Sequence, residues 1–346
     1  MDANERDYPA FGICGYSGAG KTTLIEELIR RLSGQGLRVG TIKHDAHGLD
    51  VDRAGKDTDR FFKAGADVLI RGPGESFLRS HRRDDAPLDQ VLRAFGPHVD
   101  LILVEGHKTT PLAHKLWLCG SEGDLPPPEV TNVQCILKRD EDRPRLALAM
   151  IEEVLPQLWR TAPLYAGLLM GGRSSRMGTP KHLIERDGVT WIERAAAAVR
   201  GQVEKTVLLG RGDVPTSLRD CPALCDVEDV GGPVSGMRAA MRWAPLTSWI
   251  FVPCDLPFLS ADAVRWLVDQ RRPGVWAVLP LLPGASRPEP LLAYYDFRAA
   301  PLLETVDRPS DCAGREKVIS PLIPPALAQA WQNVNTPQDL ARCASP

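Results

Sequence analysis

An apolar strand, a glycine-rich loop and a helix follow one another in FGICGYSGAGKTTLIEELIRRL, residues Phe11–Leu32. Phe11–Gly15 is a short apolar run, and the apolar residues from Leu24 to Leu32 recur at helical spacing. Between them, GYSGAGKT fits the pattern G-x-x-x-x-G-K-[ST] at every fixed position. Because strand, phosphate loop and helix occur in this order, the stretch predicts an α/β domain with a parallel sheet.

This loop predicts a site for a nucleoside triphosphate. Its glycines let backbone N–H groups close around phosphates, the Lys21 ammonium would reach the terminal phosphates, and the Thr22 hydroxyl would bind Mg²⁺. The expected nucleotide contacts are Gly15, Gly18, Ala19, Gly20, Lys21, Thr22 and Thr23.

An acidic residue at the end of a neighbouring strand usually completes the metal site of such a loop. Glu105 ends VDLILVEG (Val99–Gly106), whose nearly continuous apolar run is typical of a strand covered on both faces. We therefore expect Glu105 to be a metal ligand, and Asp45 and Asp52 remain alternatives.

The rest of the chain alternates between strand and helix patterns. Further strands are expected at Leu37–Ile42, Asp67–Ile70, Lys115–Leu118, Val133–Leu137, Leu164–Met170, Lys205–Gly210, Trp249–Cys254 and Val275–Leu279. Helices are expected at Leu146–Trp159 and Trp191–Arg200, from a cap at Ser260 through Val268, and from a cap at Thr336. The best boundary is RTAPL (Arg160–Leu164), which predicts two domains, residues 1–162 and 163–346.

Composition and charge disfavour several classes of protein. The net charge of −2, with no dense Lys/Arg tract, disfavours nucleic acid as a partner. Every apolar run is far shorter than the roughly 20 residues that span a bilayer, and MDANERDYPA does not resemble a secretory leader. The eight cysteines form no CxxC pair, and even Cys221 and Cys225 lack further zinc ligands nearby. We expect a cytoplasmic protein with reduced thiols and no membrane association.

The segment after the second expected strand carries a family resemblance. KHDAHGLDVDRAGKDTDRFFKAGAD, residues 43–67, together with VEGHK (Glu105–Lys108), resembles MobB, the GTP-binding adaptor of molybdopterin-guanine dinucleotide biosynthesis. Ala54 stands where that family usually has proline, and we interpret His44 and His47 as solvated or phosphate-facing rather than metal-binding. The resemblance implies that the first domain binds GTP, with weak GTPase activity, and that the protein forms a homodimer.

A second glycine-rich loop of different design is LLMGGRSSRMGTPK, Leu168–Lys181. It resembles L-x-G-G-x-S-x-R-M-G-x-x-K, the signature of MobA, the molybdenum cofactor guanylyltransferase. Leu169, Gly171 and Gly172 would lie against the nucleotide, since glycines allow close backbone approach. Arg176 and Lys181 would donate charge-assisted hydrogen bonds to the triphosphate. The resemblance implies a Rossmann-like nucleotidyltransferase domain after a P-loop NTPase-type parallel sheet.

Later segments extend the resemblance to about Leu340. Asp226 in DVEDVGGPVSGMRAAM would bind the nucleotide, and Asp255, which follows an apolar strand, would hold the Mg²⁺ that bridges the triphosphate. In NVNTPQDL, Asn333 and Asn335 would lie on the pterin side of the site.

The implied reaction is attack by a phosphate oxygen of molybdopterin, with or without molybdenum, on the α-phosphorus of GTP, with Lys181, Arg176 and Asp255 as catalytic residues. The product would pass to molybdoenzymes or their chaperones. Two alternatives stay open from the residues: a nucleotidyltransferase with another nucleotide or acceptor, such as CMP or a sugar phosphate, and a nucleotide-gated cofactor carrier or metallochaperone. The base that each loop selects is not legible from the residues.

Overall fold

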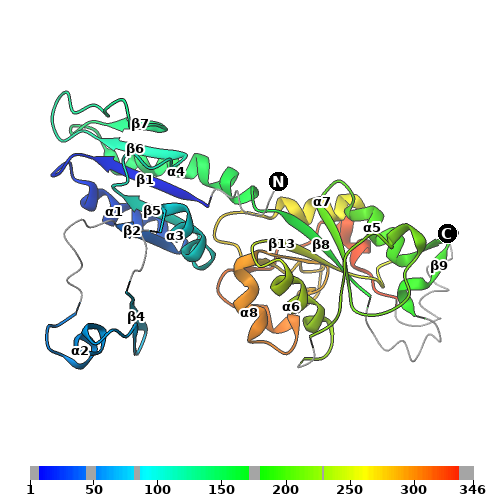
Figure 1. Cartoon of the computed structure of the whole chain (residues 1–346). Helices are drawn as coiled ribbons and strands as arrows, with labels where there is room; N and C mark the ends of the chain where they lie inside the picture. The colour runs from blue at the N-terminus through cyan, green and yellow to red at the C-terminus, as the bar shows by residue number, and fades with distance from the viewer. Residues whose placement is uncertain (1–7, 44–51, 82–85, 171–179, 228–229, 335–346) are drawn as a thin grey trace.

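Two sheets lie in separate parts of the molecule, and the long helix α4 (Arg143–Arg160) runs from the first towards the second (Figure 1). The computed structural model describes residues 8–43, 52–81, 86–170, 180–227 and 230–334. This arrangement confirms the predicted α/β class with two domains. The boundary at residue 162 stays a prediction.

The first sheet has five parallel strands. In spatial order they are β2 (Val39–Lys43), β5 (Leu101–Glu105), β1 (Ala10–Gly15), β6 (His114–Leu118) and β7 (Val133–Leu137). Helix α1 (Lys21–Gly34) and α4 cover one face, and α3 (Leu88–Phe95), followed by η1 (Gly96–His98), covers part of the other. Because both faces of β5 are covered, its sequence is apolar almost throughout.

The expected strand at Asp67–Ile70 is not part of this sheet, so its assignment to the alternating series was wrong. β3 (Val68–Gly72) pairs only with β4 (Glu75–Arg79) in an antiparallel hairpin beside α2 (Asp57–Lys63). The two residues Pro73 and Gly74 join the strands, and Gly74 has a φ of 84°. A two-residue loop with left-handed backbone returns the chain antiparallel to itself and cannot lead to a parallel neighbour.

The second sheet has seven strands, of which only β15 runs against its neighbours. In spatial order they are β12 (Ala223–Leu224), β11 (Lys205–Leu209), β8 (Leu164–Leu169), β13 (Ser248–Pro253), β15 (Ala293–Tyr295), β14 (Ala277–Val278) and β16 (Val318–Ile319). A two-stranded ribbon lies beside it, made of β9 (Glu185–Arg186) and β10 (Val189–Thr190).

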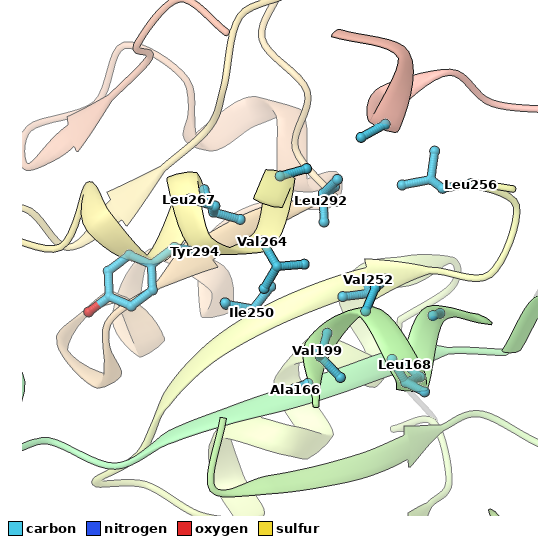
Figure 2. Packing of buried hydrophobic residues seen from close by; sticks show 14 of the residues in the cluster. Ala166, Leu168, Val199, Ile250, Val252, Leu256, Val264, Leu267, Leu292 and Tyr294 are labelled. Carbon is cyan, nitrogen blue, oxygen red and sulfur yellow. The ribbon is translucent and has the colours of Figure 1, made fainter. Parts of the chain in front are cut away.

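Helices cover both faces of this sheet. On one face α5 (Trp191–Val199) and α7 (Ala261–Asp269) pack on β8 and β13, where Figure 2 shows Val264 and Leu267 over Ile250. On the other face lie α6 (Pro233–Trp243) and α8 (Ala300–Glu304). The predicted cap at Ser260 is confirmed, because its hydroxyl accepts from the Ala263 amide at 3.2 Å. The short 3-10 helices are η2 (Lys181–Leu183), η3 (Thr216–Leu218), η4 (Phe297–Ala299), η5 (Pro309–Cys312) and η6 (Pro325–Trp331).

In the described ranges, no helix combines the length and the apolar character needed to cross a membrane. The seven cysteines within those ranges are free. The predicted helix beginning at Thr336 lies outside the described residues.

A buried polar cluster joins the two domains. The Asp100 carboxylate, which is fully buried, accepts hydrogen bonds from the indole of Trp276 and the ammonium of Lys317, each at 2.7 Å, and from the Arg38 amide at 2.7 Å. Lys317 also donates to the Gly36 carbonyl. The partners come from both halves of the chain, so this cluster fixes one domain against the other.

The joint lies at the edge where the strands of both sheets begin. Asp100 precedes β5, whereas Trp276 and Lys317 precede β14 and β16, which run parallel to β13. Both phosphate loops instead follow strand ends, after β1 and β8. Each strand spans roughly 20 Å, so the carboxyl ends of β1 and β8 lie on the far sides of their sheets from the joint and point away from each other (Figure 1).

Replacing Lys317 by methionine should destabilise the protein by about 3–5 kcal/mol, because a buried carboxylate then loses its counter-charge. Lys317 and Asp100 have side-chain exposures of 6% and 0%. The free energy of unfolding from urea titration gives the measurement. Asp100→Asn combined with Lys317→Met removes the orphaned charge and should recover part of the loss.

The matched control is Arg265→Ala, which breaks an exposed pair with Asp262 at 2.8 Å. Exposed pairs contribute about 0–1 kcal/mol, so this change should be nearly neutral. If Lys317→Met costs no more than Arg265→Ala, the buried cluster does not stabilise the joint.

Candidate nucleotide sites

The first loop is built for close backbone approach. A Cβ at Gly15 would lie 2.7 Å from the Leu118 carbonyl oxygen, so only glycine fits there. Gly20 has a φ of 90° and precedes α1, whose first amides receive no side-chain cap. Uncapped amides at a helix N-terminus attract anions. The Lys21 ammonium donates to the Tyr16 carbonyl at 2.8 Å and so folds over the loop.

The β5 flank of this loop holds the expected metal ligands. The Thr22 hydroxyl lies 3.5 Å from both carboxylate oxygens of Glu105. Asp52 instead accepts from Thr58 at 3.1 Å and pairs with Arg79 in the hairpin lobe. Asp45 lies outside the described residues. Of the alternatives, Glu105 is therefore the one that the structure places beside Thr22.

The second site brings together two residues that are 74 positions apart. Lys181 lies in η2, and Asp255 follows β13 at the carboxyl edge of the sheet. The Lys181 ammonium donates to Asp255 at 3.0 Å, with side-chain exposures of 22% and 20%. Both groups are thus accessible to a ligand at the edge where open α/β sheets bind their ligands.

Other predicted residues gather around this pair. A Cβ at Gly236 in α6 would lie 3.4 Å from both the Asp226 carboxylate and the Leu169 side chain, so these residues meet at the end of β8. The Val334 amide donates to the Asp255 carbonyl at 3.1 Å, which places the neighbouring Asn333 beside the site. The structure does not describe Gly171, Gly172, Arg176, Asn335, His44 or His47.

The oxygen ligands present suit a hard divalent cation that keeps much of its own water. Within the described ranges, no three His, Cys, Asp or Glu side chains converge as a ready-made metal cage. Mg²⁺ is commonly held by one or two carboxylates together with substrate phosphates. Asp255 in one domain, and Glu105 with Thr22 in the other, match that pattern. Burial raises the pKa of the neighbouring Cys254 thiol to about 12, which favours its protonated form.

Several residues near the sites were not singled out by the sequence. The Arg143 guanidinium donates to the Ala19 carbonyl at 2.9 Å, to the Lys138 carbonyl at 2.8 Å and to the Cys119 carbonyl, which ties the first loop to its neighbours. In the second domain the His182 ring contacts the Asp213 carbonyl at 2.9 Å. Arginines and histidines in loops are common, so nothing marks Arg143 in the sequence, and only the position of His182 next to Lys181 could have drawn attention to it.

Comparison with known families divides the chain as its sheets do. Residues 10–129 match the family of molybdopterin guanine dinucleotide synthesis protein B, MobB. Residues 166–330 match the family described as the MobA-like NTP transferase domain.

Individual relatives show the same division. A molybdopterin-guanine dinucleotide biosynthesis adapter protein from Haemophilus influenzae is 40% identical over 124 residues, which are 35% of this chain and 69% of the relative. A probable molybdenum cofactor guanylyltransferase from Bacillus anthracis is 30% identical over 140 residues, which are 39% of this chain and 69% of the relative. Among solved structures, molybdopterin-guanine dinucleotide biosynthesis protein A from Archaeoglobus fulgidus is 25% identical, with a TM-score of 0.44 over 51% of this chain and 95% of its own.

Proposed function

The chain belongs to the MobB family in its first domain and to the MobA-like NTP transferase family in its second, and on that premise we propose that the second domain transfers GMP from GTP to molybdopterin while the first binds GTP as an adaptor. The chain acts in molybdopterin guanine dinucleotide biosynthesis, and its second domain is a nucleotidyltransferase.

The observation that carries the proposal is the Lys181–Asp255 pair of 3.0 Å at the carboxyl edge of β13. In the proposed reaction a phosphate oxygen of molybdopterin forms a bond to the α-phosphorus of GTP, the bond from that phosphorus to the bridging oxygen breaks, and pyrophosphate leaves. The substrate brings its own nucleophile. Lys181, with Arg176 from the loop, neutralises charge on the triphosphate and orients it.

Asp255 would hold the divalent metal that the family uses, and we propose Mg²⁺. When bound, such an ion neutralises phosphate charge and orients the leaving group. The protein's own contribution is to fix the carboxylate: the Val334 amide donates to the Asp255 backbone, and the Lys181 ammonium contacts its side chain.

The first domain would bind GTP for a different purpose. Its loop surrounds terminal phosphates with backbone amides, and Thr22 and Glu105 stand 3.5 Å apart on the β5 flank as the metal ligands. This arrangement suits a nucleotide that is held or slowly hydrolysed. We propose that the adaptor passes the product to molybdoenzymes or their chaperones, and that the protein acts as a homodimer.

Pyrophosphate release by the full chain tests this function. With molybdopterin and Mg²⁺, we expect release with GTP to exceed that with CTP, ATP or UTP by at least about tenfold in kcat/KM, because a hydrogen-bonded base pocket rejects the wrong base. The control omits molybdopterin and should release almost no pyrophosphate.

Two results would count against the proposal. Preferred release with CTP would make the second domain a transferase of another nucleotide. No acceptor-dependent release with any nucleotide would favour a carrier over an enzyme.

A further inference from the structure

A cavity of about 430 Å³ opens on the side of the first phosphate loop that faces away from Glu105. In the sheet, β1 lies between β5, which carries Glu105, and β6. The cavity therefore lies on the β6 side of the loop. The cavity is bounded by the loop backbone, by α1, and by the segments after β6 and β7. Its lining includes Gly18, Gly20, Thr23, Gly120, Arg139 and Arg143.

Two arginines from the β7–α4 segment form the polar wall of the cavity, and they differ in how many N–H donors remain for a ligand. Arg143 is half-buried and donates to three backbone carbonyls, as described above, so it is a positioning residue for the wall. Arg139 is exposed and donates a single bond, from Nη1 to the Gly120 carbonyl at 3.2 Å. Most of its N–H donors therefore remain for a ligand.

The carboxylates on the opposite wall are less suited to contact a ligand. Glu27 in α1 accepts from Arg31 at 2.7 Å and also pairs with Arg30. The Arg31 hydrogen bond lowers the pKa of Glu27, which keeps its carboxylate charged and engaged by arginine. Glu26, the other acid of the lining, is exposed on α1.

We propose that this cavity holds the nucleoside of the triphosphate bound on the loop, and that Arg139 selects guanine there by donating to N7 and O6. The inference rests on the proposed GTP site of the first domain. Since Thr22 and Glu105 occupy the β5 flank, they would hold the metal and the terminal phosphates on that side. The nucleoside would then extend along the loop towards β6 and β7, where the cavity lies.

The chemistry of the two purines makes arginine discriminating. A guanidinium only donates hydrogen bonds. Guanine presents two acceptors on its N7/O6 edge, whereas adenine presents N7 beside an amino donor. With adenine, the N6 amino donor would therefore face the N–H donors of Arg139, and no hydrogen bond would form between them. Hypoxanthine has the same N7/O6 edge as guanine but lacks the 2-amino group, so it distinguishes this mode of reading from recognition of the opposite edge by a carboxylate.

Nucleotide titrations of the full chain test the assignment, with the first site defined as the binding component that Lys21→Ala removes. We expect ITP to bind within about threefold of GTP and ATP to bind at least about tenfold more weakly, the range of a good bidentate base contact. Arg139→Ala should reduce the GTP-over-ATP preference to about twofold or less. Arg139→Lys keeps the charge but loses the planar fork, so it should also lose most of the preference.

The matched control is Arg30→Ala, which removes a positive charge from the rim of the same cavity. It should weaken the binding of GTP and ATP alike and leave the ratio of their affinities unchanged. The inference is overturned if ITP is rejected as strongly as ATP, if Arg139→Ala preserves the preference, or if Arg30→Ala changes it equally. If Lys21→Ala removes no binding component at all, the GTP site of the first domain fails with it.

Discussion

Replacing Asp255 by asparagine should leave a folded protein that transfers GMP at least about 100-fold more slowly than the wild type, the loss typical of removing a preorganised electrostatic contact. The amide is nearly isosteric, but it carries no charge to hold a divalent metal or to pair with Lys181 at 3.0 Å. The backbone contact from Val334 would remain. The measurement is the rate of acceptor-dependent pyrophosphate release at saturating GTP and at limiting Mg²⁺.

Asp262→Asn is the matched control, since it removes the same charge from an exposed position at the start of α7. It should transfer GMP at the wild-type rate. A near-normal rate for Asp255→Asn at limiting Mg²⁺ would remove Asp255 from the metal site.

The strands that were predicted best from the sequence are those buried on both faces of a sheet. β5, β8 and β13 are buried along nearly their whole length, so their apolar runs stand out from any helical pattern. The hairpin was assigned wrongly because β3 resembles a short parallel strand until its pairing with β4 is seen. β15 has only three residues, and its place between β13 and β14 depends on tertiary contacts.

Individual candidate residues could be selected from the sequence because their expected chemistry is tied to local motifs. Lys21 and Thr22 follow from one loop, and the carboxyl end of an apolar strand marks Asp255. The pairing of Lys181 with Asp255 across 74 residues needed the fold. No pattern separates Arg139 from the other charged residues of Leu137–Asp142, since one exposed arginine in a charged loop looks the same whether or not a cavity lies beside it.

The joint between the domains was equally hidden in the sequence. Asp100 sits inside a predicted strand segment, and its partner Lys317 lies 217 residues away. Nothing in either local pattern points to the other. Yet this contact decides that the strand starts of both sheets face each other, and therefore that the carboxyl ends of β1 and β8 face opposite ways (Figure 1).

Because the carboxyl ends of β1 and β8 face opposite ways, we expect the two nucleotide sites to work separately. Lys181→Ala should lower GMP transfer at least about 100-fold while sparing nucleotide binding at the first loop. Lys21→Ala removes a charged phosphate contact from the first loop only. Such contacts contribute about 1.5–3 kcal/mol, so affinity there should fall roughly 10- to 150-fold.

The most direct measurement is the rate of GMP transfer to free molybdopterin by Lys21→Ala and Lys181→Ala, side by side, with nucleotide affinity measured on the same samples. We expect Lys21→Ala to transfer GMP at nearly the wild-type rate and Lys181→Ala to transfer almost none. If Lys21→Ala stops transfer as completely as Lys181→Ala does, with both proteins folded, the two loops form one composite site and the separation of tasks is contradicted.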